Sequence, residues 1–132
     1  MFRTKHKART WGFRCSLTDA IAIGAFMSAA VGLWYLNSPL WWLLVVAAGH
    51  FFLFCNVFRI VRRRELIWAG LLILNVGVWA WFDHLTWPSI LLTQLPITVG
   101  LIVADMRAPG YHGVLAKRLN PRLNDYLAGR FP

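Results

Sequence analysis

Long apolar segments, separated by short polar ones, dominate the pattern of this chain. A helix needs about 20 mostly apolar residues to span a bilayer, and four segments reach or approach that length: Ala20–Leu36, Leu40–Phe58, Leu66–Phe82 and Ser89–Ala104. The fourth segment is short, but Trp87 and Pro88 extend it. The pattern predicts an all-α integral membrane protein with four transmembrane helices.

Residues that favour helix boundaries lie at the ends of these segments. Ser16 and Asp19 have the spacing of a capping box, in which each side chain satisfies a backbone N–H of the first turn. Pro39 and Pro88 each fit the first position of a helix, where the missing N–H costs nothing. Pro96 lies inside the fourth segment and predicts a kink, because it removes a helix hydrogen bond.

The basic residues predict the orientation of the four spans. All 14 lysines and arginines lie before the first span, between the second and third, or after the fourth. A four-span topology places these three segments on one side of the membrane, and basic flanks stay in the cytoplasm. We therefore expect both termini to be cytoplasmic, in a bacterial cytoplasmic (inner) membrane. Six of the eight tryptophans fall at the opposite ends of the spans, where indole rings favour the headgroup boundary.

Composition supports a membrane protein. Of the 132 residues, 58% are hydrophobic and 14% are charged, compared with about 25% charged residues in soluble domains. A soluble protein of this size has too much surface for its volume to bury so many apolar side chains. A signal peptide also begins with a basic segment and an apolar run, but removing the first span would leave an odd number of spans.

The net charge of +9 is explained by this topology, so we expect no nucleic-acid partner. Basic segments beside a membrane attract anionic lipids. The arginines expected to contact such headgroups, or partner subunits, are Arg59, Arg62, Arg63, Arg64, Arg118 and Arg122. Cys15 and Cys55 would lie at the reducing cytoplasmic edge and are expected to be free thiols.

The last part of the chain is too short and too charged for a fifth span. Asn120, Pro121 and Gly129 fit the cap, the first position and the left-handed stop of a short helix. Its apolar face would lie on the membrane surface or dock on a partner; the alternative is a solvated tail. The chain thus divides into a basic cytoplasmic segment (1–15), a four-helix transmembrane domain (16–106) and a basic cytoplasmic tail with an amphipathic helix (107–132).

Small residues follow one face of the first span at a spacing of four, which lets another helix approach closely. We call this face the small-residue stripe; it consists of Ala20, Gly24, Ser28 and Gly32. The neighbouring helix is either in this chain or in another, so a homo-oligomer is one possibility.

Each span also carries a polar residue near its middle, and a rise of 1.5 Å per residue puts the four within about 5 Å in depth. This midplane polar layer consists of Ser28, His50, Asn75 and Gln94. One interpretation is structural hydrogen bonding between helices. The other is a polar site for an ion, a headgroup or a cofactor.

His50 is the candidate cofactor ligand. It follows Ala47, Ala48 and Gly49, which leave room for a flat macrocycle, and an imidazole nitrogen can ligate the iron of haem or the magnesium of a chlorophyll-type pigment. The other three histidines lie outside the spans, so His50 would be a single axial ligand. The sequence does not require any cofactor.

No catalytic motif is present. The chain contains no phosphate-binding glycine loop, HExxH, GxSxG or paired catalytic carboxylate, and no carboxylate lies deep in a span. The first hypothesis is therefore a non-catalytic integral subunit that packs against other subunits and lipids in a larger membrane complex, such as an energy-converting one. The alternatives are a membrane protein that binds a cofactor through His50 and a small homo-oligomeric transporter or flippase.

Overall fold

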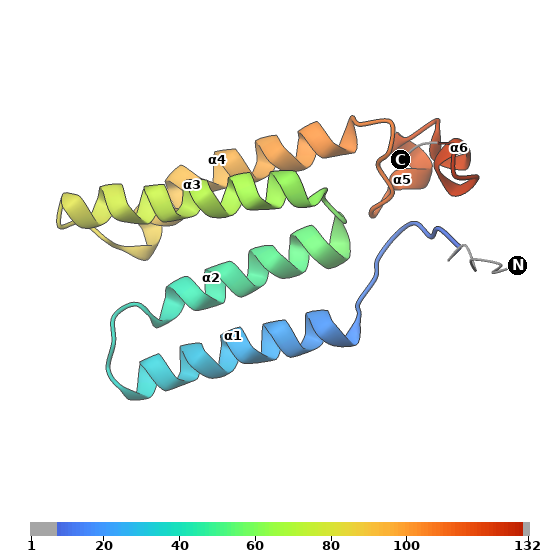
Figure 1. The fold of residues 1–132 in the computed structure, drawn as a ribbon. Coiled ribbons are helices and arrows are strands. Elements are labelled where there is room, and N and C mark those ends of the chain that lie inside the picture. The colour runs from blue at the N-terminus through green and yellow to red at the C-terminus, as the bar shows by residue number, and fades with distance from the viewer. Residues whose placement is uncertain (1–7, 131–132) are drawn as a thin grey trace, which may run out of the picture.

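The computed structural model describes residues 8–130, and within this range it is all-helical, with no β-strand. Four long helices lie side by side and alternate in direction (Figure 1). The long helices are α1 (Leu17–Tyr35), α2 (Trp41–Phe52), α3 (Arg62–Trp81) and α4 (Trp87–Met106). A π-helix, η1 (Leu53–Val57), continues α2, and two short helices follow α4: α5 (Ala116–Leu119) and α6 (Leu123–Leu127).

Two of these helices, α1 and α4, are long and apolar enough to cross a membrane, by length and composition alone. The segment formed by α2 and η1 is apolar but shorter. Helix α3 begins earlier than predicted, so Arg62, Arg63 and Arg64 form its first turn instead of a loop and lower its mean hydropathy. Only 6% of the apolar window of α1 is buried by the rest of the chain, compared with 22% for α4. Most of the apolar surface of α1 is therefore left uncovered by the rest of the described chain.

The helix boundaries follow local hydrogen bonding. The capping box of α1 is confirmed: Asp19 N donates to Ser16 Oγ at 3.2 Å, and Ser16 N donates to Asp19 Oδ2 at 2.9 Å. Thr86 caps α4, which places Pro88 at the second helical position and not the first. Pro39 lies in the turn before α2, which begins two residues later. Both prolines remain where a missing N–H breaks no helix hydrogen bond.

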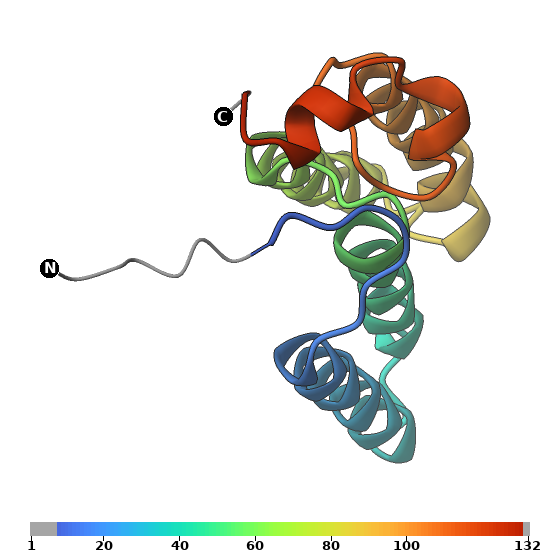
Figure 2. The ribbon, with the colours of Figure 1, turned by 90° about the vertical axis from the view of Figure 1, so that its right-hand side faces the viewer.

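The long helices form two pairs, α1 with α2 and α3 with α4. The pairs meet through a small core near the α2–α3 turn, made by Phe54, Ile60 and Trp68. Figure 2 looks along the helices and shows α1 at the far end of the row from α4. The arrangement is thus an open, curved row of helices and not a closed four-helix bundle.

The chain after α4 folds into a compact unit, which we call the C-terminal lobe (residues 107–130). Its core is formed by Tyr111, Ala116 and Leu123. The single amphipathic helix predicted from sequence is replaced by two short helices, because Asn120 and Pro121 lie in a turn between them. The left-handed stop after α6 is confirmed, since Gly129 has a φ of +76°.

Asn120 organises the turn inside the C-terminal lobe. The side chain is 5% exposed, and its Nδ2 donates to Pro109 O at 2.9 Å and to Tyr111 O at 2.8 Å. Its Oδ1 accepts the backbone N–H of Arg122 at 2.9 Å. A buried amide with all of these partners fixes the turn, so α6 begins only at Leu123.

Candidate functional site

The structure joins half of the predicted midplane polar layer. Asn75 Nδ2 in α3 donates to Gln94 Oε1 in α4 at 3.2 Å, and Thr93 Oγ1 lies 2.9 Å from Asn75 Oδ1. Gln94 is fully buried. Its Nε2 donates to the carbonyl of Trp68 at 3.4 Å, and that residue's indole N–H donates to Thr98 Oγ1 at 2.9 Å. The result is a polar network between α3 and α4.

The buried polar groups of this network have hydrogen-bond partners within the protein. Within the described residues, no buried side-chain nitrogen or oxygen lacks a hydrogen-bond partner. Buried polar groups that are all paired make helix contacts specific and leave no group oriented toward a ligand. The network therefore has the properties of interhelical bonding between α3 and α4.

Ser28 and His50 do not join the network. The Ser28 hydroxyl donates to Gly24 O of its own helix at 2.7 Å. His50 Nδ1 lies 2.8 Å from Val46 O, also in its own helix, and the imidazole stacks on Trp68 with ring centroids 4.4 Å apart. Asn75 and Gln94 are therefore in contact, whereas the Ser28 and His50 side chains bond within their own helices.

The His50 geometry fixes its tautomer. A carbonyl oxygen only accepts, so Nδ1 is the donor in the contact with Val46 O, and in a neutral ring the lone pair is then on Nε2. Histidines that bind metals commonly donate their other N–H to a backbone carbonyl in this way. One face of the ring is covered by Trp68. No group of three or more metal-ligating side chains occurs in residues 8–130.

Within residues 8–130, no other element covers the small-residue stripe. All four of its residues are exposed, and a Cβ added at Gly24 or Gly32 would meet no atom within 4 Å. Helix α1 packs on α2 through another face, where Ala30 is 3% exposed. The stripe is therefore an exposed face of α1.

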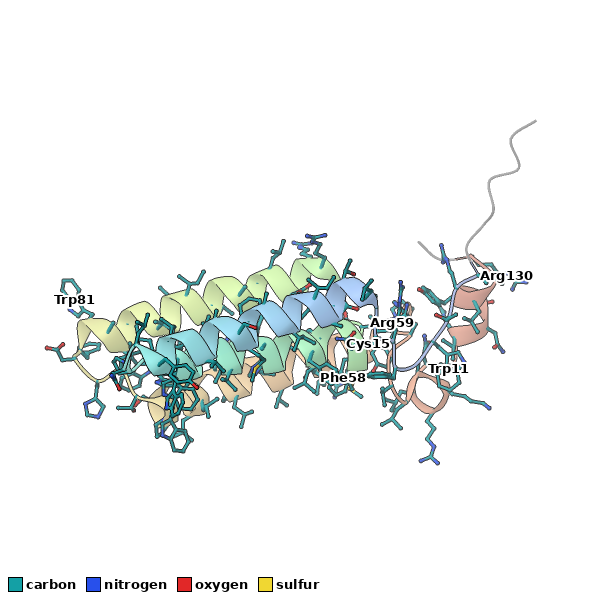
Figure 3. All side chains as sticks on the ribbon, turned by 90° about the horizontal axis from the view of Figure 1, so that it is seen from below. Trp11, Cys15, Phe58, Arg59, Trp81 and Arg130 are labelled. Atoms are coloured by element: carbon teal, nitrogen blue, oxygen red, sulfur yellow. The ribbon has the colours of Figure 1, made fainter. Side chains whose placement is uncertain are left out.

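Three segments that are far apart in sequence interlock at one end of the helix row. We call this region the basic-end junction; it comprises residues 9–16, the α2–α3 turn (56–61) and the C-terminal lobe. Backbone bonds connect the parts: Arg14 N to Asn56 O at 3.0 Å, Gly12 N to His112 O at 2.9 Å, and Val114 N to Val57 O at 2.9 Å. Figure 3 shows Trp11, Cys15, Phe58 and Arg59 at this end, with Trp81 at the opposite end.

Asn56 is a buried polar residue inside η1 that the sequence analysis did not single out. It is fully buried. With its amide oriented so that nitrogen faces the acceptors, Nδ2 lies 2.6 Å from Arg14 O and 3.0 Å from Asp19 Oδ2. The side chain thus ties the start of α1 to the end of the second helix. The available signal was a lone amide in the apolar run FCNVF.

Gly113 is a second contributor that sequence reasoning missed. A Cβ at this position would lie 2.2 Å from Phe58 O and 2.7 Å from the Tyr111 hydroxyl. No other residue type allows the C-terminal lobe to approach the α2–α3 turn this closely. Nothing local in the sequence distinguishes this glycine from the others.

The six arginines expected to contact lipids or partners divide into two groups. Arg59 Nη1 donates to Thr10 O at 2.7 Å, and Arg64 forms a salt bridge with Asp105, which is 3% exposed. These two hold the junction and the α3–α4 pair together. The other four are exposed at the basic end: Arg62, Arg63, Arg118 and Arg122.

His112 packs inside the basic-end junction. The His112 ring stacks on the Tyr126 ring with centroids 4.4 Å apart, and the guanidinium of Arg9 lies 5.1 Å from the centroid of the Tyr126 ring. His112 and Tyr126 border a cavity of about 280 Å³, to which Asp105 and Tyr111 also contribute. Burial lowers the pKa of His112, and Arg59 adds to this, whereas the Gly110 carbonyl and Asp105 act in the opposite direction.

We expect the junction to loosen as the pH falls. Because the undocked imidazole has a pKa of about 6.5 and the docked one has a lower pKa, the undocked state takes up the proton first. Docking is therefore fully stable above pH ~6.5 and weakens below it. Hydrogen exchange at the Gly12 amide, which is bonded to His112 O, should speed up between pH 7 and 5 beyond the intrinsic rate change.

The matched variant is His112→Phe, which keeps the ring stack and the backbone carbonyl but removes the titration. Its Gly12 protection should not change with pH. An equal pH response in the variant would assign the effect to another group.

The chain matches no protein-family model, no curated protein and no solved structure. The class that the described residues define is an all-helical protein with two helices able to span a membrane.

Proposed function

We propose that this chain is a four-span protein of a bacterial cytoplasmic membrane, with both termini in the cytoplasm. In this proposal it is a non-catalytic subunit that packs against other subunits and lipids in a larger membrane assembly. The observation that carries it is the exposed small-residue stripe on α1. A helix that faces only lipid gains nothing from glycine, whereas a helix that packs closely against another needs small residues.

The arrangement of charged and aromatic residues supports the four-span topology. The three basic segments meet at the basic-end junction, and Trp81 lies at the other end of the helix row (Figure 3). Helix α3 has 20 residues, and the arginines of its first turn can extend to the headgroups while their stems remain in apolar surroundings. The many exposed apolar side chains along the row, Ile21, Ile73, Leu74 and Leu92 among them, fit a lipid environment.

Thiol labelling tests the topology. Cys15 is exposed at the basic end, so a membrane-impermeant maleimide should label it in inverted vesicles and not in intact spheroplasts. An Asp83→Cys variant that lacks the native cysteines should give the reverse, because Asp83 follows α3 at the opposite end. Labelling of both positions from the same side would contradict four spans.

Placing large side chains on the small-residue stripe tests the subunit role. Gly24→Leu and Gly32→Leu should leave the chain folded, since both positions are open and leucine favours a helix by roughly 0.8 kcal/mol over glycine. The added leucine side chains should also prevent a helix of another subunit from packing closely against α1. On native gels after mild detergent extraction, we expect most of the chain to move from the assembly to the free form.

The control is Gly100→Leu in α4, an exposed position where an added Cβ also meets no atom within 4 Å. It should leave the assembly intact. A native chain that is extracted as a lone monomer, or a Gly24→Leu chain that stays in the assembly, would contradict the subunit role.

A second candidate function rests on His50. Its Nδ1 contact with Val46 O supports a lone pair on Nε2, so the residue is able to be a single axial ligand to a haem or chlorophyll-type pigment. An absorption spectrum of native material decides this. A coloured chain that becomes colourless in His50→Ala supports ligation, and a featureless visible spectrum with pigment loss excluded rejects it.

A further inference from the structure

A cavity of about 510 Å³ lies between the two helix pairs near the basic end. This volume is in the range of ligand pockets, about 300–1,000 Å³. Residues from α1, α2, η1 and α3 line it, including Thr18, Phe51, Cys55, Arg62, Glu65 and Leu66. The cavity is separate from the α3–α4 polar network, the small-residue stripe and the basic-end junction.

The cavity has a polar end and an apolar end. Arg62 and Glu65 lie three residues apart in the first turn of α3 and therefore on the same side of the helix. Phe51 comes from α2 before η1 begins, and Ala69 lies about two turns further along α3, roughly 10 Å deeper than Arg62. In the proposed topology the charged pair lies at headgroup depth, and the apolar walls extend toward the hydrocarbon.

The two charged side chains differ in burial and in their contacts. Glu65 is half-buried and accepts a weak hydrogen bond from Cys55 Sγ at 3.4 Å. Arg62 is exposed, and the salt bridges of the described residues involve neither it nor Glu65. An arginine beside a carboxylate, without a direct ion pair, matches a ligand that carries a phosphate and an ammonium group close together.

We propose that this cavity binds a zwitterionic glycerophospholipid with a primary ammonium headgroup, of the ethanolamine type. The phosphate would contact Arg62, because guanidinium groups bind phosphate oxygens through paired N–H donors. The ammonium would donate to Glu65, and an acyl chain would start along Phe51 and Leu66. The inference rests on the proposed membrane placement, but it does not depend on partner subunits.

This proposal distinguishes ethanolamine lipids from the two other common headgroup classes. A phosphatidylglycerol headgroup carries the phosphate but leaves Glu65 beside an uncompensated negative ligand. A choline headgroup carries a positive charge but no N–H, so it cannot donate to the carboxylate. Both should bind more weakly.

The test is native mass spectrometry of the purified full chain in detergent, with equal amounts of ethanolamine, glycerol and choline phospholipids of identical acyl chains. Retention of the ethanolamine lipid should exceed that of the other two by about tenfold, as expected for one charge-assisted hydrogen bond. Glu65→Gln should remove this preference, and Glu65→Asp should retain part of it. Arg62→Gln should weaken binding of all three lipids.

The matched control is Arg107→Gln, an exposed arginine after α4 that does not line the cavity. It should leave the retention of all three lipids unchanged. Preference for the glycerol headgroup, equal retention of all three lipids, or an equal loss in Arg107→Gln and Arg62→Gln would overturn the proposal. Carbonate washing of membranes gives the separate readout: release of the chain would contradict the proposed membrane placement, whereas an embedded chain without headgroup preference contradicts only the lipid site.

Discussion

Replacing Gly113 by alanine should detach the C-terminal lobe from the α2–α3 turn. The added Cβ would lie 2.2 Å from Phe58 O and 2.6 Å from Phe58 C. Both atoms belong to the backbone, so no side-chain rotation relieves the clash. Overpacking of this kind costs about 3 kcal/mol at the upper end of its usual range.

Hydrogen exchange measures this loss directly. The amide of Val114 donates to Val57 O across the contact and should exchange about a hundredfold faster in Gly113→Ala, which corresponds to roughly 3 kcal/mol. Gly110→Ala is the control, because a Cβ at that glycine meets no atom within 4 Å. Unchanged protection of Val114 in Gly113→Ala would mean that the close approach is not required.

The second large effect is expected at Asp105. This carboxylate is 3% exposed and forms a salt bridge with Arg64, which joins the first turn of α3 to the last turn of α4. Removing one partner of a buried pair leaves the other charge uncompensated and costs about 3–5 kcal/mol. Because the Arg64 side chain is 29% exposed, we expect Asp105→Leu to destabilise the α3–α4 pair by about 3 kcal/mol, the lower end.

A denaturant titration of the protein in detergent measures this change in the free energy of unfolding. The double variant Arg64→Met/Asp105→Leu should recover most of the lost stability, since an apolar pair replaces the ion pair. Asp125→Asn serves as the control. It breaks the exposed pair with Arg130, which should cost less than about 1 kcal/mol. An Asp105→Leu effect no larger than that would show that the buried pair contributes little.

Local patterns predicted the helices well because their causes are local. The capping box at Ser16 and Asp19 depends on residues three apart. Hydropathy placed α1, α3 and α4 within four residues of their observed bounds, and the second segment matches α2 only when η1 is counted as its continuation. The start of α3 was predicted four residues too late, because its first turn contains three arginines. Charge there excluded a hydrocarbon position but did not exclude a helix.

Contacts between helices were predicted only in part. The common depth expected for the polar residues predicted a contact between Asn75 and Gln94, and the two side chains are hydrogen-bonded. It could not place Ser28 or His50, because depth says nothing about the direction in which a side chain leaves its helix. Helix α1 lies at the far end of an open row (Figure 2), so Ser28 has no neighbour in α3 or α4 to bond.

The residues that the sequence did not reveal act over long separations. Gly113 contacts Phe58, and Asn56 contacts the start of α1; in each case the reason for the residue lies on a distant segment. A glycine in a loop and an amide in an apolar run are each compatible with many structures. Glycine at 113 and asparagine at 56 are required only because three distant segments pack together at the basic-end junction.

The basic-end junction also constrains the order in which the protein can mature on the ribosome. Domains form from the N-terminus as synthesis proceeds, yet the backbone carbonyl of Val57 and the amide of Gly12 receive their partners only from residues 112 to 114. Until translation has passed that point, the nascent chain presents these groups to water. Formation of the junction is therefore a late event in synthesis, and a chain truncated just after α4 would lack both backbone bonds.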